Sequence, residues 1–333
     1  MRNPILRKKR NVYTKNRICP GPIGPRLREQ IRDIRKGHRG FVAQWFKMKL
    51  VPVELGPHQT NARGKLEFNR MFRAFERMGS NMKNGQITRV GFIPRLRKTN
   101  SNEIGEIEVP IADGKFFDYI ETVLSRGGGL RRWRQKKEKR GINFRQPSSR
   151  EYYERIHNRV TFNIGMNSIL EVGQGAGGEP THVLVMKRPK TVPIEPEVHD
   201  FPAGLVRKGQ SPVEAVTKRA AEEVGINPRS ISIIGPDFKP TKEEVIFALQ
   251  RLDRLANYNG VVIQRATISI ERARENVEKA IREGKRTRNA WSPIGYYLIP
   301  RNPEAIRTFI KKYPTFMPEV LRLYSFELLR KGK

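Results

Sequence analysis

The stretch that decides the fold is Gly204–Ile226, which reads GLVRKGQSPVEAVTKRAAEEVGI. Ser211 followed by Pro212 is a typical helix start, because proline is favoured in the first helical turn. Gly225 suits a left-handed residue at the end of that helix. Apolar residues recur between these ends at helical spacing, at Val213, Val216, Ala220 and Val224. The stretch therefore predicts a loop that leads into an amphipathic helix.

The polar face of this helix carries charges of both signs. Arg219 precedes Glu223 by four residues, so helical geometry places both side chains on one face, where they can pair. An ordinary amphipathic helix with surface glutamates would look similar. The spacing of Gly204 and Gly225 and the preceding Pro202-Ala203 favour a more specific motif.

The stretch resembles the Nudix box, a motif of glutamates, an arginine and two glycines at fixed spacing. The positions that agree with it are Gly204, Glu222, Glu223, Gly225 and Ile226. The preceding Phe201-Pro202-Ala203 looks like the lead-in of ADP-ribose pyrophosphatases of that family. The resemblance implies an α/β fold, namely a Nudix-like α/β/α sandwich with a mixed sheet.

Four positions depart from the motif: Gln210 for a glutamate, Lys218 for the arginine, Arg219 for a glutamate and Ala220 for a larger aliphatic residue. In an active member of the family, positions 219 and 223 would be carboxylates that hold Mg²⁺ or Mn²⁺. Such cations need several oxygen ligands. A guanidinium stays protonated and has no lone pair to offer, so Arg219 would repel the metal. Without the metal, its Lewis acidity and water activation are lost together.

We therefore expect no catalytic residue, no metal ligand and no cofactor in this domain. The alternative is an active pyrophosphohydrolase that uses Mg²⁺ or Mn²⁺ on a nucleoside diphosphate derivative or on RNA 5′ ends. In that case Glu222 and Glu223 would be the catalytic residues, with Glu243 or Glu244 as a further carboxylate.

The segments around the stretch read as alternating strands and helices. The pattern predicts strands at Arg159–Met166, Ser168–Val172, Thr181–Arg188, Ile231–Ile234 and Val245–Leu252. It predicts helices at Ile270–Glu283, Pro303–Lys312 and Pro318–Leu329. Gly173–Gly178 is predicted to be a turn, because it lacks the lysine and hydroxyl residue of a phosphate-binding loop.

Charge separates the two halves of the 333-residue chain, whose net charge is +33. Residues 1–150 hold 36 basic and 12 acidic residues, whereas residues 151–333 hold 30 and 21. Such an excess favours a phosphate-rich partner through counterion release.

Membrane headgroups are the other polyanion, but no strongly amphipathic basic helix supports them. No apolar run approaches the ~20 residues that span a bilayer, and the single cysteine, Cys19, excludes an internal disulfide.

Three regions follow from this composition. Residues 1–28 form a basic extended arm or a transit-like segment, residues 29–150 a basic RNA- or partner-binding α+β region, and residues 151–333 a Nudix-like domain with C-terminal helices. The pattern in the middle region predicts helices at Arg26–Lys36, Glu67–Met78 and Lys115–Leu124, and strands at Thr88–Leu96 and Ile104–Val109. Phe41–Phe46 is an aromatic segment without a predicted structure.

Two basic clusters are the predicted RNA contacts. One lies in the arm, and the other follows a run of glycines and contains a tryptophan that could stack on a base. A solvated linker is the alternative for the second cluster. The residues are Arg7, Lys8, Lys9, Arg10, Arg126, Arg131, Arg132, Trp133, Arg134, Lys136, Lys137, Lys139 and Arg140.

These observations predict a non-enzymatic RNA-binding protein whose partners are RNA, in particular rRNA, and neighbouring proteins of a ribonucleoprotein. The chain is similar to the Nudix-like protein of the mitochondrial ribosomal large subunit. That resemblance implies a location in the mitochondrial matrix. A third interpretation is a component of an organellar mRNA-processing complex that binds a nucleotide or a 5′ phosphate.

Overall fold

The structure is a computed structural model, and it describes part of the chain. The described residues are 41–54, 66, 69–70, 72–73, 76, 85–90, 95–96, 104–125, 163–175, 178–190, 192, 196–252, 257–287 and 292–331. No helix among them is both long and apolar enough to cross a membrane.

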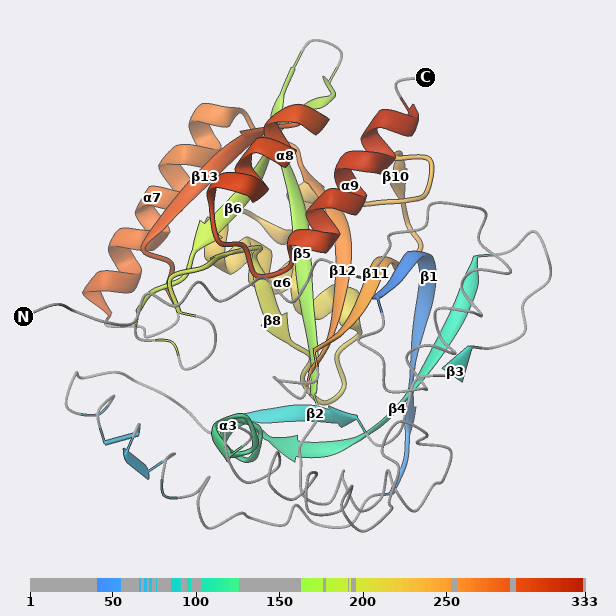
Figure 1. The fold of residues 1–333 in the computed structure, drawn as a ribbon, viewed down its shortest axis with the longest axis vertical. Helices are drawn as coiled ribbons and strands as arrows, with labels where there is room; N and C mark the ends of the chain where they lie inside the picture. The colour runs from blue at the N-terminus through green and yellow to red at the C-terminus, as the bar shows by residue number, and fades with distance from the viewer. Residues whose placement is uncertain are drawn as a thin grey trace, which may run out of the picture.

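The described strands form one mixed sheet, shown in Figure 1. They are β1 (Phe41–Pro52), β2 (Gln86–Val90), β3 (Arg95–Leu96), β4 (Gly105–Lys115), β5 (Asn163–Gln174), β6 (Pro180–Lys187), β7 (His199–Asp200), β8 (Ala203–Leu205), β9 (Ile231–Ile234), β10 (Pro240–Thr241), β11 (Val245–Leu252), β12 (Asn257–Ala266) and β13 (Gly295–Pro300). The helices are α3 (Phe116–Ser125), α6 (Pro212–Val224), α7 (Ile270–Arg286), α8 (Pro303–Lys312) and α9 (Pro318–Lys331), with a short 3₁₀ helix at Pro228–Ser230.

Strand β5 lies at the centre of this sheet. Every residue from Asn163 to Gly173 is buried, and only Gln174 at the end is exposed. The strand pairs in parallel with β12 and antiparallel with β6 and β8. Because both faces of a central strand meet other layers, its sequence is almost continuously buried, as expected for a parallel pairing covered on two sides.

Six of the strands close into a ring. From β12 the pairing runs through β11, β1, β4 and β2 to β5, and β5 pairs directly with β12. The link between β2 and β5 is the pair Arg89 and Asn163. Apolar side chains from these strands, including Phe46, Val109 and Tyr258, form one buried cluster with side chains of α6. The N-terminal strands therefore share a core with the C-terminal ones.

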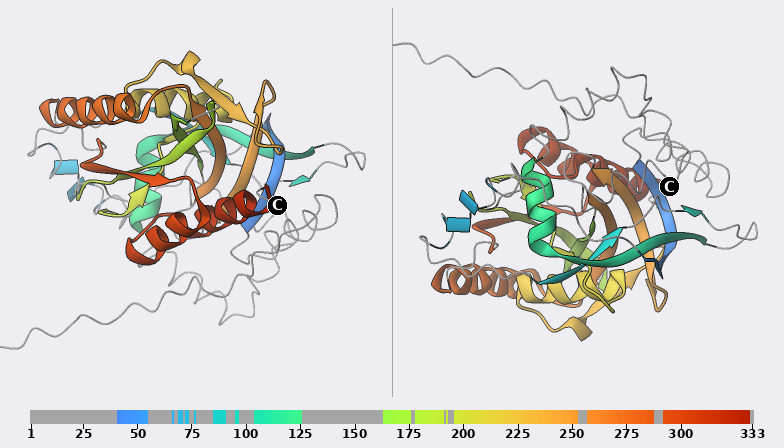
Figure 2. Two further views of the ribbon diagram at one scale, coloured as in Figure 1. Left: turned by 90° about the horizontal axis from the view of Figure 1, so that it is seen from above. Right: turned by 90° about the horizontal axis from the view of Figure 1, so that it is seen from below.

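The helices cover the sheet on two sides. In both views of Figure 2, α6 and α7 lie on one side of β5 and β6, and α8 and α9 lie on the other. One buried cluster joins Leu170 and Val172 to Val277 of α7. A second joins Ile169 to Phe309 of α8 and other residues of α8 and α9. The predicted α/β/α sandwich with a mixed sheet is confirmed, and the described N-terminal elements are of the α+β type.

The ends of α6 agree with their sequence signals. Ser211 caps the helix, since its Oγ accepts a hydrogen bond from the backbone N–H of Glu214 at 3.0 Å. Pro212 occupies the first turn. Gly225 adopts φ +65° and its N–H bonds to the carbonyl of Ala221. The predicted start and end are both confirmed.

Short-range sequence patterns predicted most of the other long helices and strands. Strands at Ile231–Ile234 and Val245–Leu252 and the helix Pro303–Lys312 have the predicted bounds. The two strands predicted at 159–166 and 168–172 are one strand, β5, because its polar residues are buried in the sheet rather than turned to solvent. The strand predicted at 88–96 is two separate strands, β2 and β3.

Several strands were not predicted from the sequence, and β1 and β12 are the longest of them. The aromatic segment at 41–46 is the first half of β1. Strand β12, with the sequence NYNGVVIQRA, is buried at nine of its ten positions. Asparagine and glycine are rare in strands, so the sequence pattern did not indicate a strand at β12. The predicted domain borders near residues 28 and 150, the extended arm and the helix at 26–36 lie outside the described residues.

Substituting Gly225 tests the capping geometry. We expect Gly225→Ala to lower the free energy of unfolding by about 1–2 kcal/mol, because a Cβ is unfavourable at positive φ. The measurement is urea denaturation followed by circular dichroism. Gly85→Ala is the control, since a Cβ there meets no atom within 4 Å. Equal stability of Gly225→Ala and wild type would contradict the assignment of this cap.

Candidate functional site

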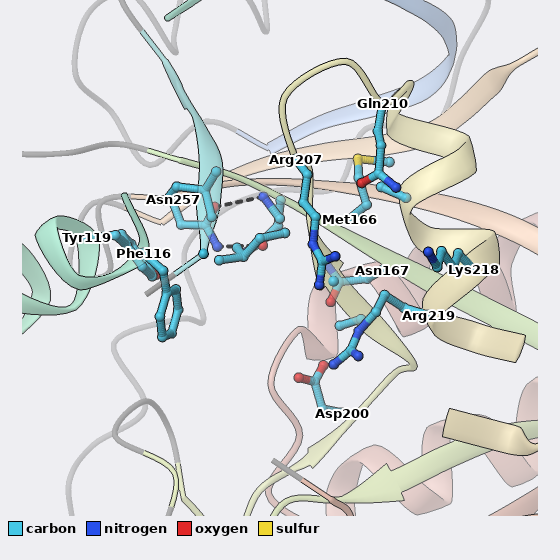
Figure 3. A pocket seen from close by; sticks show the side chains of 18 of the residues that line it. Phe116, Tyr119, Met166, Asn167, Asp200, Arg207, Gln210, Lys218, Arg219 and Asn257 are labelled. Carbon is cyan, nitrogen blue, oxygen red and sulfur yellow. Dashed lines mark hydrogen bonds between the residues drawn. The ribbon is translucent and has the colours of Figure 1, made fainter. Parts of the chain in front are cut away.

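A pocket of about 310 Å³ opens between α6 and the N-terminal elements. Its floor is the β5 segment 165–167, and β8 and α6 form one side. The opposite side consists of residues from β2 and α3, and two asparagines of β12 complete it. Figure 3 shows the labelled side chains of α6 on one side of the pocket and those of α3 on the other. The site therefore needs elements from both halves of the chain.

Arg219 of α6 lies directly against the backbone of β8. A Cβ built on Gly204 would lie 2.4 Å from Cγ of Arg219, which is closer than two carbon atoms can approach. Glycine at 204 thus makes room for the stem of the side chain at 219. The guanidinium reaches the pocket, which Arg219 lines.

Arg219 forms ion pairs with both glutamates of the helix. Its Nη1 donates to Oε2 of Glu222 at 2.9 Å, and its Nη2 lies 3.5 Å from Oε1 of Glu223. The charge of Glu223 is the largest cause that raises the pKa of Arg219. The pairing that helical spacing predicted is confirmed, and it extends to a second carboxylate.

Glu223 has a structural contact of its own. Its Oε2 accepts a hydrogen bond from the backbone N–H of Ala203 at 3.3 Å, which fixes α6 to the start of β8. Burial raises the pKa of Glu223 to about 7, and the charge of Arg219 opposes that shift. Near neutral pH the carboxyl group is thus only partly ionised.

A second ion pair holds the segment that precedes β8. Nη1 of Arg188 lies 3.2 Å from Oδ2 of Asp200, and both side chains are largely buried. Oδ1 of Asp200 accepts the backbone N–H of Phe201 at 2.8 Å. These contacts set the path of Phe201-Pro202-Ala203, whose last residue donates to Glu223. Phe201-Pro202-Ala203 therefore positions the end of α6 that carries Glu223.

Two further cations line the pocket. Arg207 and Lys218 are exposed residues of its wall, and neither has an acidic partner among the described residues. Gln210 also lines the wall, at the position where the motif expects a glutamate. In Figure 3 the guanidinium of Arg207 extends toward Arg219 and Asn167. The side of the pocket along α6 is therefore rich in positive charge.

The opposite end of the pocket is polar but uncharged. Oδ1 of Asn257 accepts the backbone N–H of Gly165 at 3.0 Å, and its Nδ2 donates to Oδ1 of Asn259 at 2.8 Å. A Cβ on Gly165 would lie 2.4 Å from Oδ1 of Asn259, so glycine is required beneath this pair. Nδ2 of Asn259 has no hydrogen-bond partner among the described residues. These asparagines were not predicted from the sequence, because they lie on β12, which local patterns did not indicate.

Aromatic residues of α3 form the adjoining wall. Phe116 and Tyr119 both line the pocket, and their rings lie 6.4 Å apart. Phe72 from the preceding helical segment contacts Phe117 of α3 edge-on, with ring centroids 5.5 Å apart. Phe72 thus supports the helix that forms this wall.

The residues do not fit a divalent cation. No group of three or more His, Cys, Asp or Glu side chains is arranged to hold a metal among the described residues. Glu222 and Glu223 both pair with Arg219. Glu243 pairs with Lys47 at 3.0 Å, and Glu244 accepts a hydrogen bond from Ser211 at 2.7 Å. Glu222, Glu223, Glu243 and Glu244 therefore do not form a set of metal ligands.

The structure does not test the predicted RNA contacts. All of them lie outside the described residues: Arg7, Lys8, Lys9, Arg10, Arg126, Arg131, Arg132, Trp133, Arg134, Lys136, Lys137, Lys139 and Arg140. They stay predictions. The predicted motif residues Gly204, Gln210, Arg219 and Glu222, by contrast, all line the pocket.

Comparison with known proteins identifies the domain. Residues 170–285 match the family model of the NUDIX domain. No curated protein matches the chain. Similar solved structures include a MutT/Nudix family protein from Listeria innocua, at 16% identity over 51% of this chain and 95% of that chain, with a TM-score of 0.34. An Ap4A hydrolase from C. elegans is 14% identical over 51% of this chain and 99% of that chain, with a TM-score of 0.29.

The pKa of Glu223 predicts a pH dependence of stability. Between pH 4.5 and about 7 the folded protein keeps a proton that the unfolded chain releases, so this group lowers stability as the pH rises. Glu223→Gln removes the titration. We expect the stability of the variant relative to wild type to increase by about 3 kcal/mol from pH 4.5 to pH 8.

Urea denaturation at pH 4.5, 6 and 8 measures this difference. The control is Glu222→Gln, which removes the other carboxylate paired with Arg219 but leaves Glu223 in place. That control should keep the wild-type pH dependence. If the free energies of unfolding of Glu223→Gln and wild type changed with pH in parallel, the raised pKa of Glu223 would be contradicted.

Proposed function

Residues 170–285 form a Nudix domain, and we propose that this domain has no hydrolase activity and serves as a structural module of an RNA-binding protein. The full proposal is a non-enzymatic component of an organellar, mitochondrial ribosome or ribonucleoprotein, located in the matrix. Its partners are rRNA and neighbouring proteins.

The position of Arg219 carries the first part of the proposal. A permanent positive charge lies between the two glutamates that remain of the box, at 2.9 Å and 3.5 Å. A divalent cation at this point would have to displace the guanidinium and overcome its repulsion. Gln210 supplies no charge to compensate. The loss of the metal removes the Lewis acid on which hydrolysis of a pyrophosphate depends.

The charge distribution carries the second part. Most of the +33 net charge belongs to residues 1–150, which contain 36 basic and 12 acidic residues. Neutralising RNA phosphates with lysine and arginine releases condensed counterions, and this supplies affinity without sequence specificity. A long basic region attached to a compact domain is the composition expected of a protein that orders on RNA. The resemblance of the box to a mitochondrial ribosomal protein is consistent with this.

A hydrolase remains the second candidate because two carboxylates of the motif persist. Glu222 lines the pocket and Glu223 lies next to it on α6. The substrate would be a nucleoside diphosphate derivative or an RNA 5′ end, with Mg²⁺ or Mn²⁺ as cofactor. This candidate requires Arg219 to move away from both carboxylates.

The first test is a hydrolysis assay with a restoration variant. We expect no release of product from ADP-ribose or 5′-triphosphate RNA by the full chain with Mg²⁺ or Mn²⁺. Gln210→Glu with Arg219→Glu returns two carboxylates, so divalent-cation binding measured by calorimetry should strengthen at least tenfold. Turnover by wild type that disappears in Glu223→Gln would refute the proposal. Unchanged metal affinity in the restoration variant would contradict the role given to Arg219.

The second test concerns RNA. Lys136→Ala with Lys137→Ala and Lys139→Ala should reduce the salt dependence of rRNA binding, with the slope of log K against log salt falling by roughly 2–3. The matched control is Lys279→Ala with Lys285→Ala and Lys311→Ala, which removes three exposed lysines of α7 and α8. In organelle lysates the protein should sediment with ribosomal particles at physiological salt. Sedimentation as free protein would argue against the assembly.

A further inference from the structure

Tyr297 of β13 is the most exposed member of a group of packed aromatic rings. Its ring centroid lies 5.0 Å from that of His199, 5.4 Å from that of Phe309 and 4.8 Å from that of Tyr313. The rings of Phe309 and Tyr313 lie 5.0 Å apart. His199 and Phe309 are buried, whereas Tyr297 is 36% exposed. Buried rings thus support one tyrosine ring at the surface.

The direction of the Tyr297 side chain follows from the geometry of β13. This strand ends the strand order of the sheet and pairs with β6, as Figure 1 shows. Because successive side chains of a strand point to opposite faces, Tyr296 and Tyr297 lie on different sides of the sheet. The hydroxyl of Tyr296 donates to Oε1 of Glu278 on α7 at 2.9 Å, whereas the ring of Tyr297 contacts Phe309 on α8. The face of β13 toward α8 therefore carries the exposed ring.

Two lysines border this group of rings. Lys187 is the cross-strand partner of Gly295, two residues before Tyr297, so its side chain lies on the same face as the exposed ring. Gly295 places no side chain between them. Nζ of Lys312, at the end of α8, lies 5.2 Å from the ring centroid of Tyr313. Neither lysine has a carboxylate partner among the described residues.

An exposed ring beside cations without acidic partners suits single-stranded RNA. A base stacks on an aromatic ring, and lysine pairs with the neighbouring phosphates. Duplex RNA covers the faces of its bases by stacking, so only a single strand can use the ring. Protein interfaces are depleted in lysine, whereas Lys187 and Lys312 both border these rings. Charge and aromatic surface together therefore favour RNA over a protein partner.

We propose that Tyr297, Lys187 and Lys312 form a contact site for single-stranded RNA, in which the tyrosine ring stacks on one base and the lysines pair with the adjacent phosphates. None of the three residues lines the pocket beside α6. The inference rests on the RNA binding proposed above, and it adds a base contact that the predicted basic clusters do not include.

Fluorescence anisotropy with a short single-stranded oligouridylate tests the stacking. In the full-length protein, Tyr297→Leu should weaken binding about tenfold, because a ring that stacks on a base contributes roughly that factor. Tyr297→Phe keeps the ring and should bind about tenfold more tightly than Tyr297→Leu. Tyr296→Leu is the matched control, since it removes a ring from the opposite face of the same strand, and its affinity should equal that of wild type. Thermal denaturation checks that each variant is folded.

Polyphosphate separates stacking from charge, because it has phosphates but no bases. Tyr297→Leu should weaken binding of oligouridylate and leave binding of polyphosphate as in wild type. Lys187→Ala with Lys312→Ala should weaken both, and the slope of log K against log salt for oligouridylate should fall by about 1–2. Lys279→Ala with Lys285→Ala removes the same charge from α7 and should keep the wild-type slope.

Photo-crosslinking supplies a measurement that needs no variant. Wild-type protein is irradiated with oligouridylate that contains 4-thiouridine, and mass spectrometry locates the crosslinked residue. A crosslink at Tyr297 is the expected result. Crosslinks confined to other parts of the chain would overturn the inference.

The binding data can overturn the inference in two further ways. Equal affinity of Tyr297→Leu and Tyr297→Phe for oligouridylate would exclude stacking on this ring. If Tyr297→Leu left oligouridylate affinity unchanged but released the protein from ribosomal particles, the surface would bind a protein instead. In both cases wild type still binds RNA, so the proposed function stands. Absence of any RNA binding by wild type would refute that function as well, which distinguishes the two failures.

Discussion

The position of β5 is the constraint on which the other elements depend. Eleven consecutive residues of this strand are buried, and β12, β6, β8 and β2 all pair with it. Residues at its start form the floor of the pocket, and Glu171 near its end is fully buried. Oε2 of Glu171 accepts from Arg265 at 3.0 Å, and Oε1 accepts from Arg301 at 2.7 Å and from Tyr324 of α9. Ionic contacts thus fix one end of β5, and the other end forms the floor of the pocket.

The pocket exists because the N-terminal strands close the ring beside β5. Without β2 and α3 the pocket would lack the wall opposite α6. The Arg219 ion pairs differ in their exposure to water. The side chain of Glu222 is 48% exposed, whereas that of Glu223 is 19% exposed, so salt screens the pair with Glu222 more than the pair with Glu223. The N-terminal half therefore contributes to the site through its strands, whatever its basic segments bind.

Sequence patterns predicted the parts of the site that are local in the chain. The limits of α6, the pairing of Arg219 with Glu223 and the role of Gly225 all follow from short-range spacing and capping rules. The asparagine pair could not be found in this way, because Asn257 and Asn259 meet Gly165 across 92 and 94 positions and lie on a strand with weak β-propensity. The ring of strands was hidden for the same reason, since long-range pairing leaves little trace in local composition.

The motif residues that match and those that depart have different physical roles in this chain. Gly204 gives space to the side chain at 219, Glu223 holds the backbone of Ala203, and Gly225 ends α6. Each of these roles is needed for the fold, with or without a metal. Three of the four departures, Gln210, Lys218 and Arg219, line the pocket. Gln210 and Arg219 change its charge, whereas Lys218 keeps the charge of the arginine that it replaces. The Nudix framework is therefore compatible with the replacement of two carboxylates of its motif by a neutral side chain at position 210 and a cation at position 219.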